Sequence, residues 1–77
     1  MTLRRGGLYA AKRIVISWRG IISPGEIVMF IGSCPLVIAE KPVEGWASAW
    51  VLHGERVDKV HYEDSVKAWE EDWMLVC

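Results

Sequence analysis

Residues 46–62, WASAWVLHGERVDKVHY, contain the pattern that decides the fold of this chain of 77 residues. Side chains alternate between residues 46 and 52, as they do in a strand that turns one face to a core. One face carries Trp46, Ser48, Trp50 and Leu52, and the other carries Ala47, Ala49 and Val51. The small alanines indicate a face that another element approaches closely.

The second half of this stretch predicts the other strand of a β-hairpin. The His-Gly pair at residues 53–54 gives a tight turn, and residues 55–62 alternate again. Val57 and Val60 are out of phase with each other, which predicts a β-bulge near Asp58.

Turn signals separate three further strands upstream of the hairpin. The strands expected there span residues 13–18, 26–31 and 36–40. Pro24 and Gly25 suit the two central positions of a type II turn. Residues 32–35 break the apolar run between the second and third strands, and residues 41–45 predict another loop.

The two ends of the chain differ from this centre. Residues 1–7 are expected to form a loose basic tail, and residues 8–12 either form a helical turn or lead into the first strand. Residues 63–73 predict an acidic-aromatic helical turn, because acids lie at its start and apolar residues follow at spacings of three and four. Residues 74–76 are apolar and predict a closing strand.

Together these elements predict a single, mainly β domain over residues 1–77. We expect a small curled sheet or barrel of about five to six short antiparallel strands, with one short helix or 3-10 turn near the C-terminus. A chain this short buries only about 60% of its unfolded surface. Its hydrophobic fraction of 52%, with five tryptophans, is nevertheless enough for a core without a staple.

Several short motifs lie in the centre of the chain. They are Pro24-Gly25-Glu26-Ile27-Val28, Gly32-Ser33-Cys34-Pro35-Leu36-Val37-Ile38, Trp50-Val51-Leu52-His53-Gly54-Glu55-Arg56-Val57 and Tyr62. Over residues 24–66 this set resembles the small bacterial proteins of the YodC type, which implies an SH3-like small β-barrel for that centre. Ser33-Cys34 stands where the family has paired glycines, and His53 stands where it has an aspartate. That family has no established activity, so the resemblance implies a fold and no function.

The composition argues against a membrane protein or a secreted protein. No apolar run approaches the roughly 18 residues of a membrane span, and the first residues lack the apolar region and cleavage site of a signal peptide. We therefore expect a cytoplasmic protein. Cys34 and Cys77 are then expected to be reduced thiols, with a disulfide-linked dimer through Cys77 as the alternative.

The sequence holds no recognisable catalytic, metal-binding or nucleotide-binding motif. The candidate nucleophiles and bases are Cys34, Cys77, His53 and His61, and no family-specific signature surrounds Cys34. The cysteines are too far apart in the sequence for the paired spacing of a zinc site, and no glycine-rich phosphate loop is present. We expect a non-catalytic protein without a metal or another cofactor.

The acidic-aromatic segment supports the first of three functional hypotheses. Its candidate partner-binding residues are Glu63, Asp64, Trp69, Glu70, Glu71, Asp72 and Trp73. Tryptophan anchors and complementary charge would let them bind a basic protein surface, whereas the alternative is a solvated acidic face over two core tryptophans. By analogy, the protein would be a phage or mobile-element inhibitor, of the anti-CRISPR or a similar anti-defence type, that occludes a host surface which handles nucleic acid.

The second hypothesis is a nucleic-acid-binding barrel that uses the basic N-terminal segment. Its candidate residues are Arg4, Arg5, Lys12, Arg13, Trp18 and Arg19, with Trp46 and Trp50 as further stacking surfaces. Residues 1–20 carry no acid, whereas residues 21–77 carry all ten acidic side chains, which would repel a polyanion. The opposed charges could instead attract each other within one fold.

The third hypothesis is a small structural or assembly protein that self-associates through spare apolar surface. The sequence is compatible with a monomer or a homodimer.

Overall fold

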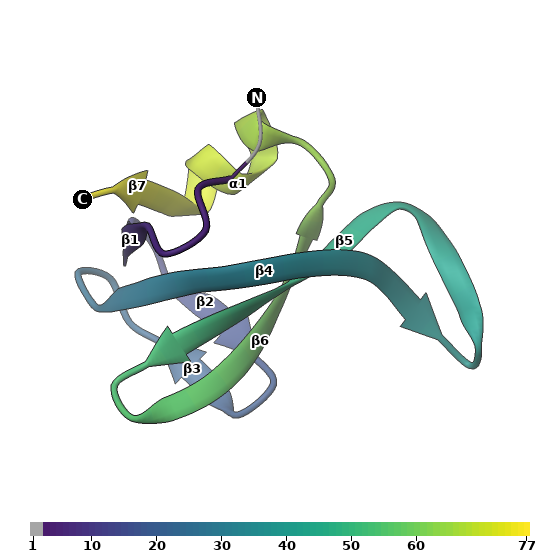
Figure 1. Ribbon diagram of the computed structural model, residues 1–77, viewed down its shortest axis with the longest axis horizontal. Helices are drawn as coiled ribbons and strands as arrows, with labels where there is room; N and C mark the ends of the chain where they lie inside the picture. The colour runs from purple at the N-terminus through teal and green to yellow at the C-terminus, as the bar shows by residue number, and fades with distance from the viewer. Residues whose placement is uncertain (1–2) are drawn as a thin grey trace.

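Seven antiparallel strands form one open, curled sheet, and a short helix precedes the last strand (Figure 1). The computed structural model describes residues 3–77. The elements are β1 (Leu8–Ala11), β2 (Val15–Ser17), β3 (Gly20–Ile22), β4 (Ile27–Ile38), β5 (Lys41–His53), β6 (Arg56–Glu63), α1 (Val66–Asp72) and β7 (Trp73–Leu75). The strand order across the sheet is β3-β2-β6-β5-β4-β1-β7. The predicted mainly β class with a short helix near the C-terminus is confirmed, with seven strands instead of five to six.

The β5–β6 hairpin has the alternation that the sequence predicts. Ala47, Ala49 and Val51 are buried, and their register with β6 runs without a shift from Trp46 opposite Glu63 to His53 opposite Arg56. The bulge predicted near Asp58 is therefore absent from this hairpin. Instead, the Asp58 side chain takes an inward position and is only 3% exposed. A buried carboxylate needs hydrogen-bond partners, and these are described with the site below.

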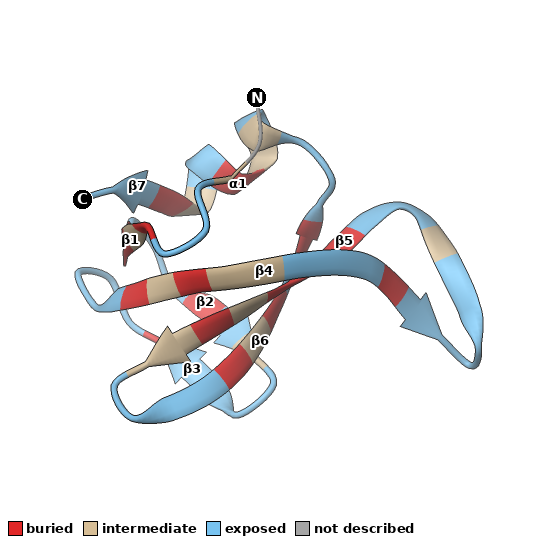
Figure 2. Ribbon diagram, viewed as in Figure 1, coloured by how far each residue is buried: buried red, intermediate tan, exposed pale blue. Residues whose placement is uncertain are grey.

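The neighbouring β4–β5 hairpin is longer than predicted. Residues 32–35 and 41–45, expected as loops, lie within the two strands, and register shifts mark the places where β4 departs from regular pairing. The chain reverses at Ala39 and Glu40, which both have positive φ, 52° and 65°. A two-residue hairpin turn that matches the sheet twist requires this conformation, and Gly or Asn usually supplies it. The distal part of the hairpin projects from the body and is mostly exposed (Figures 1 and 2).

The N-terminal segment is tied to the sheet. Gly6 N–H donates to the Phe30 carbonyl at 2.7 Å, and Phe30 N–H donates to the Gly7 carbonyl at 2.9 Å. The prediction of a loose tail is thus wrong for residues 3–7, because these bonds extend the pairing of β1 with β4; residues 1–2 lie outside the described part. Residues 8–11 form a strand between β4 and β7, not a helical turn.

The core is centred on Trp69, which α1 carries into the middle of an aromatic cluster. Ser65 caps the helix by accepting the Ala68 N–H at 3.0 Å. The Trp69 ring stacks on Trp73 at 5.2 Å and meets Tyr62 edge to face at 5.0 Å. Strand β7 then pairs with β1, as the apolar run at residues 74–76 predicts.

Candidate nucleic-acid interface

The outer face of the sheet can be followed from the register of the strands. Paired residues of antiparallel strands turn their side chains to the same face. Ala49 and Val60 are paired and buried, so their neighbours Trp50 and Lys59, also paired with each other, face outward. Gly32 of β4 is the partner of Trp50 on the other side of β5.

Two tryptophans and a lysine form a contiguous group on this outer face. The Lys59 Nζ lies 4.5 Å from the centre of the Trp50 ring and 5.8 Å from the centre of the Trp18 ring. The Arg19 guanidinium lies 5.6 Å from the Trp18 ring on the β2–β3 turn. Each distance is within the range of a cation–π contact. Trp18 is 69% exposed, and Trp50 and Lys59 are half-buried.

Arg5 extends this group beyond β5. Its Nε donates to the Ile31 carbonyl at 2.9 Å, and its Nη2 lies 3.4 Å from the place where a Cβ on Gly32 would be. Because Gly32 pairs with Trp50, that Cβ direction is the outer face. We name the set Arg19, Trp18, Lys59, Trp50 and Arg5 the tryptophan–cation row. Within residues 3–77, its three cations have no carboxylate within salt-bridge distance.

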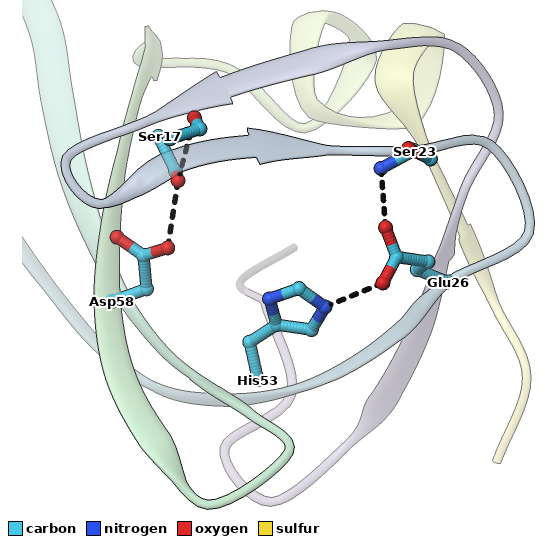
Figure 3. A network of polar contacts seen from close by, with 6 residues as sticks. Ser17, Ser23, Glu26, His53 and Asp58 are labelled. Atoms are coloured by element: carbon cyan, nitrogen blue, oxygen red, sulfur yellow. Dashed lines mark hydrogen bonds and ion pairs between the residues drawn. The ribbon is translucent and has the colours of Figure 1, made fainter.

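Asp58 fixes the turn that holds Trp18 and Arg19, and Figure 3 shows its contact with Ser17 just before that turn. Its carboxylate accepts the Ser17 hydroxyl at 2.6 Å, the Arg19 N–H at 3.1 Å and the Lys59 N–H at 2.7 Å. Burial alone would raise the pKa of Asp58, but these hydrogen bonds outweigh it and hold the pKa below its ordinary value. Asp58 is therefore an ionised anchor beneath the row.

Backbone bonds complete the attachment of the β2–β3 turn to β6. Trp18 N–H donates to the Lys59 carbonyl at 2.8 Å, and the Arg19 side chain donates through Nε to the Val57 carbonyl at 2.8 Å. These contacts place Trp18 beside Lys59 although the two residues are far apart in the sequence. The row is thus held by the fold and does not depend on a loose arm.

A second polar contact joins the turn before β4 to the β5–β6 turn (Figure 3). His53 Nε2 lies 2.9 Å from Glu26 Oε2, and the Ser23 N–H donates to Glu26 Oε1 at 2.7 Å. The Ser23 amide, followed by His53, lowers the pKa of the Glu26 carboxyl. His61 hydrogen-bonds to Ser48 at 2.8 Å, so neither histidine is hydrogen-bonded to a cysteine in the described part of the chain.

The other basic candidates lie away from the row. Arg13 pairs with Asp72 at 3.1 Å, and Lys12 Nζ donates to the Glu70 carbonyl at 2.9 Å. The N-terminal basic segment and the acidic helix therefore meet within the fold, which was the alternative left open by the charge pattern. Arg4 lies at a cavity of about 430 Å³ between the N-terminal segment and α1.

The acidic-aromatic set does not form the surface that the sequence predicts. Trp69 and Trp73 are 0% and 2% exposed, so they belong to the core and present no surface to a partner. Their helical spacing reflects packing on the sheet. The acidic members Glu63, Asp64, Glu70 and Glu71 are exposed, and Asp72 is half-buried beside Arg13.

Sequence reasoning missed Lys59 and Asp58, although a signal for Lys59 was present. A hairpin that turns at residues 54–55 pairs Trp50 with Lys59, so the register could have placed the ammonium beside the indole. Asp58 has no such signal, because a charged residue at an inward position of a strand looks like a break in the alternation. Only the contact with the β2–β3 turn explains its burial.

No protein-family model matches the chain, and no curated protein or solved structure is significantly similar to it. The resemblance to the YodC type has no support from these comparisons and stays a prediction. The helical part of residues 3–77 is too short to cross a bilayer. No group of three or more His, Cys, Asp or Glu side chains among those residues is arranged to hold a metal ion.

Proposed function

We propose that this protein is a nucleic-acid-binding domain whose contact surface is the tryptophan–cation row. The observation that carries the proposal is the position of the Lys59 ammonium between two indole rings, without a carboxylate partner among the described residues. Arg19 and Arg5 place further positive charge at either side. Cations beside aromatic rings are the combination that binds phosphates and bases together.

The overall charge of −1 does not oppose this proposal, because the charges are segregated. Arg13 is paired with Asp72, and the exposed acids Glu70 and Glu71 lie on α1, which contributes no residue to the row. Glu63 ends the same strand as Lys59, but it lies opposite Trp46, outside the row. Three cations that release counterions from a single strand give a slope of log K against log salt of about −2. We expect weak binding that is strongest at low salt.

A protein contact on the neighbouring β2–β3 hairpin is the second candidate function. Ile14, Ile16 and Ile21 are 63%, 80% and 64% exposed. Contacts with the phosphates and bases of a nucleic acid would not use these aliphatic side chains. Apolar side chains gathered at an open sheet edge are typical of a surface that meets another protein. If the protein is an inhibitor or self-associates, we expect the protein contact to be made by this hairpin and not by the acidic helix.

Titration of labelled oligothymidylate at low salt, followed by fluorescence anisotropy, tests the first candidate. Lys59→Gln is expected to weaken binding and to reduce the salt slope by about 0.7. Arg13→Gln removes the same charge from a paired site and serves as the matched control. Absence of binding at low salt would rule the proposal out.

Sizing chromatography of wild type and Ile16→Ser tests the second candidate. A wild-type dimer that Ile16→Ser converts to monomer identifies a second copy as the occupant of the hairpin. This candidate is excluded if the wild-type protein is a monomer and binds no other protein through a contact that Ile16→Ser weakens.

A further inference from the structure

The geometry of the row points to the form of nucleic acid that it takes, an inference that rests on the proposed function. In a duplex the bases are stacked inside, and a protein at the surface meets mainly phosphates and groove edges. Trp18 projects from a turn and offers an indole to solvent. An indole surface gains stacking energy only from a base that has left its own stack. The indoles therefore favour an unpaired strand over a duplex.

The Lys59 ammonium lies over the same rings that a base would use. Its contact with Trp50 at 4.5 Å covers part of that ring in the free protein. A cation–π contact at a partly exposed site is weak, and a lysine stem is flexible, so a phosphate can draw the ammonium away at little cost. The ring is then open to a base.

Both ring centres lie within 6 Å of the same ammonium, so one short segment of strand can reach both. We propose that the row binds an unpaired strand by exchange: a backbone phosphate takes the Lys59 ammonium, and two bases of the same strand stack on Trp18 and Trp50. Arg19 and Arg5 contact the phosphates on either side. In the free protein the Lys59 ammonium therefore lies over the Trp50 ring, and in the complex it binds a phosphate.

The first test compares three polyanions with the wild-type protein under the same low-salt conditions. Oligothymidylate supplies phosphates and unpaired bases, a blunt duplex of the same length supplies paired bases, and inorganic polyphosphate supplies charge alone. The expected result is that oligothymidylate binds at least tenfold more tightly than the other two. Equal binding of oligothymidylate and duplex would overturn the exchange mechanism and leave the proposed function standing, whereas no binding of any of the three would remove both.

The second test uses the tryptophans themselves. Trp18→Ala and Trp50→Ala are each expected to weaken oligothymidylate binding roughly 5- to 100-fold and to leave the residual binding of duplex unchanged. Trp46→Ala is the matched control, because Trp46 is exposed on the same face but lies opposite Glu63, outside the row. An equal loss in all three variants would contradict the assignment of the two bases.

The third test isolates the lysine. Lys59→Met keeps the length of the stem and removes the ammonium. It is expected to lower the salt slope by about 0.7 while the preference for oligothymidylate over duplex persists, because both indoles remain. Loss of that preference in Lys59→Met would mean that Lys59, and not stacking, selects the strand.

Discussion

The tryptophans of this protein lie in two regions, one buried in the core and one exposed on the outer face of the sheet. At the C-terminal end, Trp69 and Trp73 are buried against the sheet, Arg13 pairs with Asp72, and Lys12 donates to the Glu70 carbonyl. On the outer face, Trp18 is 69% exposed, and the Arg19 and Lys59 side chains lie within cation–π distance of its ring. In the sequence both regions combine aromatic and charged residues. The difference teaches that exposure of the rings, which the sequence pattern does not give, separates a candidate binding surface from the core.

The largest expected effect is on the stability of the buried region. Trp69→Ala should lower the free energy of unfolding by about 3–5 kcal/mol, because it empties the centre of the aromatic cluster. Trp18→Ala should change it by no more than about 0.5 kcal/mol, since its ring is largely in solvent. Urea unfolding followed by circular dichroism measures both. Similar losses in the two variants would erase the contrast between the regions.

Asp58 links the core to the outer face, and its replacement should have an intermediate effect. Asp58→Asn puts an amide donor where the carboxylate now accepts three hydrogen bonds. We expect a loss of about 1–3 kcal/mol at neutral pH, together with weaker oligothymidylate binding because the Trp18 turn is released. Asp72→Asn, which changes a half-buried carboxylate that pairs with Arg13, is the control for stability.

The same carboxylate predicts a pH dependence with a definite sign. The folded pKa of Asp58 is below its unfolded value of about 3.9, so its contribution to stability is present above that value and is lost as the pH falls through the folded pKa. Glu26 acts in the same direction. Urea midpoints between neutral and acidic pH should therefore decline less steeply in Asp58→Asn. An unchanged slope would mean that Asp58 carries no such stabilisation.

The smallest expected effect concerns the ion pair that joins the two ends of the chain. Arg13→Gln should cost less than about 1 kcal/mol, because the Arg13 side chain is 60% exposed and its pair with Asp72 is screened by solvent. High salt should reduce this cost further. A double-mutant cycle with Asp72→Asn measures the coupling free energy of the pair. A coupling well above about 1 kcal/mol would show that the pair stabilises the fold more than an exposed ion pair does.

The sequence was sufficient to predict the elements with strong local signals. The alternation over residues 46–52 and the closing strand before the C-terminus are present in the structure. The helical turn expected over residues 63–73 forms only over Val66–Asp72, and its first turn holds no acid because Glu63 still belongs to β6. The sequence could not predict the β4–β5 reversal at Ala39 and Glu40, because neither residue is a usual turn former and tertiary pairing imposes the positive φ. For the same reason, residues 32–35 and 41–45, which were expected to be loops, belong to the strands β4 and β5.

The candidate site was predicted only in part. Trp18, Arg19, Arg5 and Trp50 were among the residues considered for nucleic acid, but their grouping depends on the contact between the β2–β3 turn and β6. That contact joins segments that are distant in sequence, and local periodicity carries no information about it. The acidic tryptophans failed as a site because a helical apolar stripe has the same spacing whether it meets a partner or the protein's own core.

If the tryptophan–cation row is the nucleic-acid interface, the outer face binds the nucleic acid and the charged C-terminal end does not. Two charge reversals, Lys59→Glu and Arg13→Glu, change the net charge by the same amount on the two regions. We predict that Lys59→Glu abolishes measurable binding of oligothymidylate at low salt, whereas Arg13→Glu keeps binding within a few-fold of wild type. Equal losses in the two variants, or a greater loss in Arg13→Glu, would contradict the account.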